Sequence, residues 1–188
     1  MYKGKPFSIR KVEEVKRDIE TAKKIFIGSK TLFIGDSDPL IMRTEQLAEI
    51  VKHAYRVFPN LVRVTSYARA KTVIRTKSKD DMRTLRGAGL TRIHMGLETG
   101  DPWLLEFVKK GATPEEIVEA GRMVLDAGME LTEYVIIGLG GEWWSEQHAL
   151  GTAEVLNKIN PTFIRPVSYT HLRAHETEAD LVCRLLLE

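Results

Sequence analysis

The sequence predicts an α/β domain, or part of one, built on a parallel β-sheet, and three observations carry this prediction. Short β-branched or aliphatic runs recur along the chain, segments of helical periodicity lie between them, and small or polar residues follow each run. A strand that recurs with a helix between its copies is the βαβ unit, which has parallel strands and right-handed crossovers. The runs begin at Thr31, Leu61, Arg92, Leu131 and Thr162, so that successive starts are 30, 31, 39 and 31 residues apart.

The segments between these runs carry signals for the start and end of helices. Capping boxes are predicted at residues 78–81 and 113–116, where Ser or Thr precedes Asp or Glu by three positions. The second box opens an apolar pattern of helical period that should stop at Gly128. A shorter helix is expected to start at Asp101-Pro102 and to end at Gly111.

Length and composition limit the class of protein. The chain has 188 residues, whereas a whole (β/α)8 barrel typically needs about 250. Its net charge is +2 with basic and acidic residues interspersed, so charge does not indicate nucleic-acid binding. Neither a membrane span nor a secretory leader is predicted, and a single cysteine permits no internal disulfide. A cytoplasmic protein is the expectation.

Small and polar residues collect at the carboxyl end of every predicted strand. In parallel α/β folds this rim is where ligands bind. Spacing does not separate barrels from open sheets, but five strands that contribute to one rim favour a curved barrel or partial barrel. The rim segments are Gly35 to Asp38, Ser66 to Arg69, Glu98 to Gly100, Gly138 to Glu142, and Arg165.

Each rim feature taken alone has an ordinary structural explanation. A glycine after a strand is usually part of a turn, and a lone acid such as Asp38 is more often a helix cap than a ligand. His94 alternates with Gly96 and Glu98 on one strand face, so an interior histidine is favoured over a metal ligand. For the pair Trp143-Trp144, packing over the rim is favoured over stacking on a base.

Together the segments resemble one family. F-I-G-D-S-D-P, M-G-L-E-T-G-D with the following V-K-K-G-A-T-P-E-E-I, and V-I-I-G-L-G-G-E resemble, in register, motifs of the radical S-adenosylmethionine (radical SAM) superfamily. The resemblance runs from about residue 1 to residue 166. It implies a partial (β/α)6 barrel that holds a [4Fe-4S] cluster and S-adenosylmethionine, and that cleaves the latter reductively to a 5′-deoxyadenosyl radical. It also implies a reductant such as flavodoxin or ferredoxin as a partner.

The resemblance implies cofactor-binding positions at the ends of four strands. The glycine-rich stretch would contact the amino group of the methionyl part of S-adenosylmethionine. The next two strand ends would lie near the carboxylate and the ribose of the cofactor, and the fourth strand end would lie near its adenine. S-adenosylmethionine carries an ammonium, a carboxylate and a sulfonium, which suits the charges at these positions. The positions are, in the same order, Gly35, Asp36, Ser37 and Asp38; Ser66, Arg69 and Glu98; Ile137 and Gly138.

The sequence departs from the family pattern at the iron–sulfur cluster. The family binds its cluster through three cysteines after the first strand, and residues 1–166 contain none. The resemblance therefore implies that the first strand and the cluster loop precede this chain, and that Met1 is an internal methionine. The run from Thr31 would then be a sheet edge. No catalytic or metal-binding residue is assigned to the chain, which is expected to be inactive as given.

The end of the chain has a separate resemblance. Residues 167–188 resemble, in one reading frame, a translated adapter of the kind used in sequencing-library preparation. The predicted domains are a truncated radical SAM core at residues 1–166 and a non-native tail at 167–188. Cys183, His171 and His175 lie in this tail and are expected to have no function.

Two other functions remain open from the residues alone. An ordinary (β/α) barrel enzyme could act on a phosphorylated or carboxylated metabolite, with the glycines from Gly138 to Gly141 as an anion-binding turn. A non-catalytic barrel scaffold would bind no ligand at the rim. A cysteine motif immediately upstream of Met1 in the parent gene would separate the radical SAM fragment from the ordinary barrel enzyme. The substrate and any accessory domain are not predicted.

Overall fold

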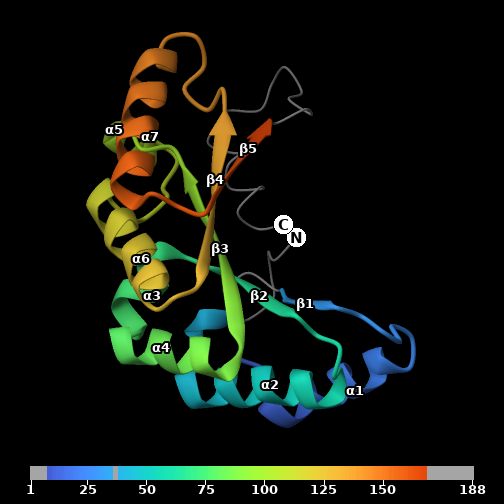
Figure 1. The fold of residues 1–188 in the computed structure, drawn as a ribbon. Coiled ribbons are helices and arrows are strands. Elements are labelled where there is room, and N and C mark those ends of the chain that lie inside the picture. Colours follow the sequence, from blue (N-terminus) through green and yellow to red (C-terminus); the bar gives the residue numbers. More distant parts are fainter. Residues whose placement is uncertain (1–7, 36–37, 169–188) are drawn as a thin grey trace.

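A computed structural model describes residues 8–35 and 38–168, which form one parallel β-sheet with helices against one of its faces (Figure 1). Predictions for Asp36, Ser37 and the tail beyond Ser168, including Cys183, lie outside the described residues. The strand order β1-β2-β3-β4-β5 follows the chain order, as expected for successive βαβ units. The strands are β1 (Thr31–Ile34), β2 (Arg63–Ala68), β3 (Leu90–Glu98), β4 (Glu130–Ile137) and β5 (Phe163–Ser168).

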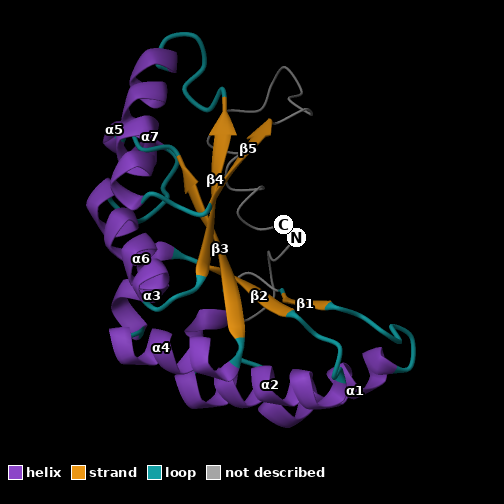
Figure 2. Cartoon of the chain, viewed as in Figure 1, coloured by secondary structure: helices purple, strands orange, loops and turns teal. Residues whose placement is uncertain are grey.

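The helices lie on the convex side of the curved sheet, and no described helix covers the opposite face (Figure 2). The sheet therefore forms part of a barrel wall, which confirms the predicted α/β fold with a partial parallel barrel. The helices are α1 (Val12–Lys23), the 3-10 helix η1 (Pro39–Ile41), α2 (Thr44–Val57), α3 (Ala70–Thr76), α4 (Lys79–Ala88), α5 (Pro102–Phe107), α6 (Pro114–Asp126) and α7 (Ser145–Ile159).

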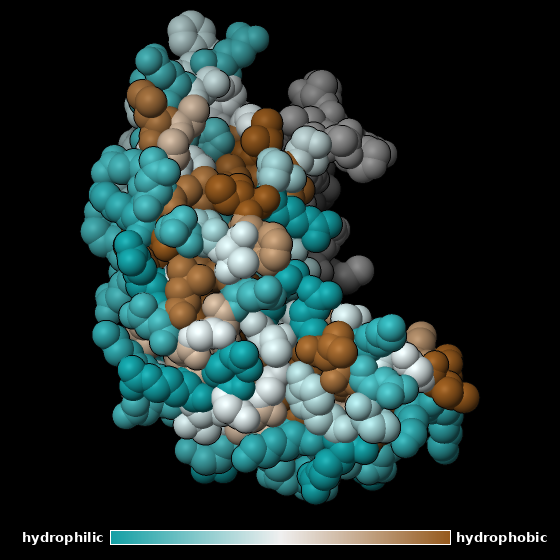
Figure 3. Space-filling view, viewed as in Figure 1, coloured by the Kyte–Doolittle hydropathy of each residue, from teal (hydrophilic) through white to brown (hydrophobic). Residues whose placement is uncertain are grey.

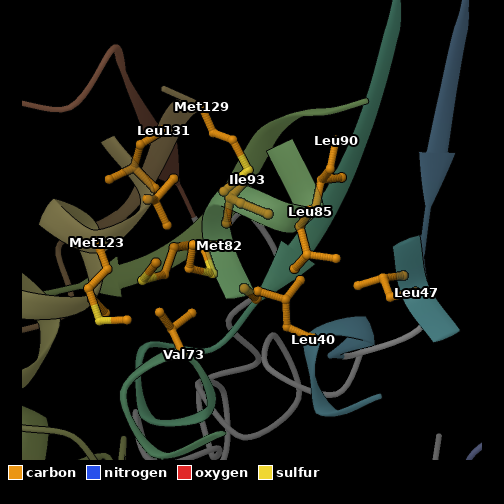
Figure 4. Close-up of a cluster of buried hydrophobic side chains, with 14 of the residues drawn as sticks. Leu40, Leu47, Val73, Met82, Leu85, Leu90, Ile93, Met123, Met129 and Leu131 are labelled. Atoms are coloured by element: carbon orange, nitrogen blue, oxygen red, sulfur yellow. The ribbon is translucent and has the colours of Figure 1, made fainter. Parts of the chain in front are cut away.

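The main hydrophobic core fills the space between the sheet and these helices. Figure 4 shows Met82 and Leu85 of α4 close to Ile93 of β3, with Met123 of α6 and Leu131 of β4 beside them. All five side chains are buried. Burial of such a side chain stabilises the fold by about 1.5 to 3 kcal/mol relative to exposure. The same core includes Val64 and Ala68 of β2, so it fixes the position of the carboxyl ends of β2, β3 and β4.

The predicted capping boxes are present at the starts of α4 and α6, where Ser78 and Thr113 each exchange hydrogen bonds with the residue three positions later. Gly128 follows α6 with a φ of 78°, a left-handed conformation that glycine adopts without strain. One boundary differs from the prediction. Helix α5 ends at Phe107 rather than Gly111, because Lys109 already has a φ of 55° and leaves the helical conformation.

Both edges of the described sheet are open. Strand β1 pairs only with β2 and strand β5 only with β4, so the prediction that β1 is an edge holds for the described residues. Strand β5 continues to Ser168, two residues past the predicted domain boundary, and Val167 and Ser168 are in register with Ile136 and Ile137. Strand pairing uses backbone groups, which any sequence supplies, so the boundary at residue 166 stays a prediction.

Candidate functional site

The described residues among the nine predicted cofactor-binding positions all lie at or near the carboxyl ends of strands. Gly35 and Asp38 follow β1, Ser66 and Arg69 lie at the end of β2, and Glu98 is the last residue of β3. Ile137 and Gly138 occupy the end of β4. The strands are parallel, so these ends share one edge of the sheet.

Asp38 is held against the start of α3. One carboxylate oxygen accepts a hydrogen bond from the backbone N–H of Arg69 at 3.4 Å, and the other accepts one from the hydroxyl of Thr72. Burial raises the pKa of Asp38, and the bond from Thr72 opposes the rise. This carboxylate therefore joins the segment after β1 to the start of α3, and it makes no capping hydrogen bond to η1, the helix that it precedes. The side chain of Arg69 extends into solvent at the same place.

Ser66 faces the helices rather than the open side of the sheet. It is fully buried, between Val64 and Ala68 on the same side of β2, and its hydroxyl lies 3.2 Å from the carbonyl oxygen of Ile34 and 3.0 Å from that of Tyr67. The contact with Ile34 ties the end of β1 to β2. A role for Ser66 in cofactor binding stays a prediction.

Glu98 forms a buried ion pair at the end of β3. Its Oε1 lies 2.9 Å from Nζ of Lys110, and the two side chains are only 9% and 10% exposed. Glu98 has a φ of 61°, which is uncommon for a residue with a side chain and occurs mainly in constrained sites. A Cβ at Gly96 would stand 2.1 Å from that Oε1 and 2.9 Å from Nζ. Glycine at position 96 therefore leaves the space in which the pair forms.

A second acid, Glu133 of β4, is fully buried near this pair. No hydrogen bond of ordinary geometry from the described residues reaches either carboxylate oxygen. Burial raises the pKa of Glu133 well above its usual value, the nearby charge of Lys110 opposes the rise, and that of Glu98 adds to it. Burial therefore favours the protonated form of this carboxyl group. Sequence reasoning missed it, although an acid within the apolar run L-T-E-Y-V-I-I was a visible signal.

A buried polar network fixes the turn that follows Glu98. The imidazole Nε2–H of His148 donates to the carbonyl oxygen of Ile136 at 3.0 Å, and Nδ1 accepts from the Thr99 hydroxyl at 2.8 Å. Burial lowers the pKa of His148, which suits this neutral tautomer. The N–H of Gly100 donates to the hydroxyl of Thr152 at 3.0 Å. The β3–α5 turn is thereby bound to α7, and sequence reasoning did not anticipate this.

The end of β4 is open for close approach of a ligand. Ile137 is 56% exposed, and Gly138 has a φ of 80° with no atom within 4 Å of where a Cβ would stand. Trp144 packs nearby, and its Nε1–H donates to Asp101 at 3.1 Å, in agreement with the packing role predicted for it. Trp143 is exposed.

A groove of about 860 Å³ runs beside the edge strand β1, bordered by α1, η1 and α2. Gly35 and Asp38 line its end, so it reaches the rim. Most of its lining is apolar, with Val15 and Ile19 of α1 opposite Leu32 of β1. The groove therefore joins the open edge of the sheet to the predicted glycine-rich segment.

The residues of this chain do not provide the ligands that a [4Fe-4S] cluster needs. Such a cluster needs three or four thiolate ligands, and the only cysteine of the sequence, Cys183, is outside the described residues. Within residues 8–35 and 38–168, no three His, Cys, Asp or Glu side chains are grouped as metal ligands. None of the helices in these ranges is long and apolar enough to cross a membrane.

The chain belongs to the radical SAM superfamily, whose family model matches residues 2–152. Solved structures share the fold. Coproporphyrinogen III oxidase (HemN) from Escherichia coli, a radical SAM enzyme, is 16% identical with a TM-score of 0.66, and the match covers 93% of this chain and 42% of that one. Methylornithine synthase (PylB) is 15% identical with a TM-score of 0.65, and the match covers 96% and 55%. HydG, a maturase of the [FeFe]-hydrogenase, is 17% identical with a TM-score of 0.62, covering 99% and 45%.

This chain thus spans about half the length of these structures, or less. No curated protein matches the sequence. The family uses S-adenosylmethionine and a [4Fe-4S] cluster, and its members are enzymes that act with small-molecule cofactors.

Proposed function

We propose that this chain is the S-adenosylmethionine-binding part of an enzyme that cleaves the cofactor reductively to a 5′-deoxyadenosyl radical. The family match over residues 2–152 supports this function over a metabolite-binding barrel or a scaffold. The cluster that supplies the electron would be bound by cysteines upstream of Met1, with flavodoxin or ferredoxin as reductant. The chain as given would hold no cluster and be inactive.

The observation that carries the proposal is the buried pair of Glu98 and Lys110 at the rim. Within the described residues the carboxylate of Glu98 is paired with Lys110 through Oε1, which leaves acceptor capacity on the carboxylate for a ribose hydroxyl or an ammonium. Arg69 extends a guanidinium suited to a carboxylate from the neighbouring strand end. Ile137 and Gly138 offer an apolar surface and open backbone for the adenine.

Glu98→Gln should weaken S-adenosylmethionine binding by about 1 to 3 kcal/mol in the protein restored with its upstream segment, because a charged acceptor is lost from a buried site. Isothermal titration under anaerobic conditions measures the affinity. Glu106→Gln, an exposed acid on α5, is the matched control and should bind like the parent. Equal affinities for the Glu98 variant and the control, with both proteins folded, would remove Glu98 from the site.

A further inference from the structure

A row of aromatic side chains crosses the open face of the sheet, on the side away from the helices. Phe33 of β1, Tyr67 of β2, His94 of β3 and Tyr134 of β4 come from four adjacent strands. The ring centroids are 4.7 Å apart for Phe33 and Tyr67, 6.1 Å for Tyr67 and His94, and 6.0 Å for His94 and Tyr134. The molecule is hollowed on this side (Figure 3).

This aromatic row is accessible. Phe33 is 46% exposed and Tyr67 is 40% exposed, and no described element covers them. Single exposed aromatics are common, but a contiguous set on a concave surface is typical of a binding site. Aromatic rings favour edge-to-face or offset contact with another ring, so the row has the chemistry to hold a planar molecule.

Positive charge surrounds the row. The pKa of His94 is lowered to about 4. Burial is the largest cause, and the positive charges of Arg92, Arg165 and Arg63 lower it further. Arg92 is neutralised by Glu130, with 2.7 Å between Nη2 and the carboxylate. Arg165 lies over the ring of Tyr134 at 5.5 Å from its centroid. Neither Arg63 nor Arg165 has a carboxylate partner within the described residues.

The surplus of guanidinium groups indicates the charge of the ligand. Arginine matches the planar geometry of carboxylates and phosphates through paired N–H donors. His94 is neutral at pH 7 and lies 3.4 Å from the Tyr134 hydroxyl through Nδ1, so it adds hydrogen-bonding capacity without further charge. A cationic ligand would meet repulsion from Arg63 and Arg165.

We propose that the open face binds a planar aromatic molecule with an anionic group, its ring against Phe33, Tyr67 and His94 and its anion at Arg165. This inference rests on the proposed function in one respect, which is that such a molecule would be the substrate of the radical SAM enzyme. The binding itself needs neither S-adenosylmethionine nor a cluster.

Isothermal titration of the full 188-residue chain with four probes tests the proposal. Naphthoate and naphthyl phosphate carry both features, naphthylmethanol only the ring, and cyclohexanecarboxylate only the acid. At least one of the first two should bind about tenfold or more tightly than either single-feature probe, since a charge-assisted pair contributes about that factor. The order of naphthoate and naphthyl phosphate distinguishes a carboxylate from a phosphate ligand.

Two variants connect binding to the named residues. Arg165→Gln should lower the affinity for the better anionic probe about tenfold and leave naphthylmethanol unchanged. Tyr67→Leu should weaken binding of both the better anionic probe and naphthylmethanol, and Arg75→Gln, at an exposed position on α3, should change neither affinity. Circular dichroism checks that each variant is folded. Equal binding of naphthoate, naphthyl phosphate and naphthylmethanol, absence of binding, or an unchanged affinity in folded Arg165→Gln would overturn the proposal.

Failure of this proposal is separable from failure of the proposed function. Probe binding is measured without the cofactor, whereas the proposed function is tested by cofactor cleavage in the restored protein. If the restored protein cleaves S-adenosylmethionine but the chain binds no probe, only the proposed substrate class is overturned. If the probes bind as expected but the restored protein cleaves no S-adenosylmethionine, only the proposed radical chemistry is overturned.

Discussion

Replacing Glu133 with glutamine should stabilise the protein relative to the parent at pH 8, with the advantage fading as the pH falls towards 4. Glu133 is fully buried and its pKa in the folded protein is well above the ordinary value of 4.5. Above pH 4.5 the unfolded chain releases this proton while the folded protein retains it. The unfolded state is thereby favoured by about 1.4 kcal/mol per pH unit, until the folded pKa is reached.

The measurement is the free energy of unfolding in urea at several pH values from 4 to 8. The difference between Glu133→Gln and the parent should grow with pH, because glutamine does not titrate. Glu119→Gln, at an exposed position on α6, is the matched control and should show no such slope. A pH-independent difference between Glu133→Gln and the parent would mean that Glu133 ionises in the folded protein as easily as in the unfolded chain.

Gly100→Ala should lower the free energy of unfolding by about 3 kcal/mol, which is near the upper end of the usual cost of overpacking. A Cβ at this position would stand 2.1 Å from the carbonyl oxygen of Gly151 and 2.8 Å from Cα of Thr152. These atoms belong to the backbone of α7, so no side-chain rotation relieves the contact. Helix α7 must move, which also strains the hydrogen bond from Gly100 N–H to Thr152.

Gly87→Ala provides the matched control for Gly100→Ala. Gly87 lies within α4, and no atom is within 4 Å of the position of its Cβ. Alanine there should stabilise the protein by about 0.5 to 1 kcal/mol, since glycine loses more backbone entropy in a helix. Urea unfolding measures both. If Gly100→Ala costs under about 1 kcal/mol, the close contact between the β3–α5 turn and α7 is not as tight as described.

Local sequence signals predicted the fold because each depends on neighbours in the chain. The spacing of the strands predicted the parallel sheet. The capping boxes at Ser78 and Thr113 predicted two helix starts, because a capping box involves residues only three positions apart. The end of α5 was wrong because no local signal marks the left-handed Lys109.

The candidate site was predicted less completely, because its contacts join distant parts of the chain. The turn after Glu98 depends on His148 and Thr152, about fifty positions later, and the pairing of Glu98 with Lys110 depends on the space that Gly96 leaves. Asp38 and Ser66 were placed at the rim by the family pattern, yet their side chains bond to α3 and to β1. Motif resemblance locates a position on a strand but not the direction in which its side chain points.

The production of 5′-deoxyadenosine from S-adenosylmethionine tests the central claim most directly. The protein to measure carries the upstream segment of its own gene and the native continuation after residue 166, reconstituted anaerobically with iron and sulfide and supplied with a strong reductant. We expect an iron–sulfur absorbance and release of 5′-deoxyadenosine, with neither from the 188-residue chain, whose single cysteine cannot hold the cluster. A restored protein that forms a cluster but releases no 5′-deoxyadenosine, or that forms no cluster, would contradict the proposed function.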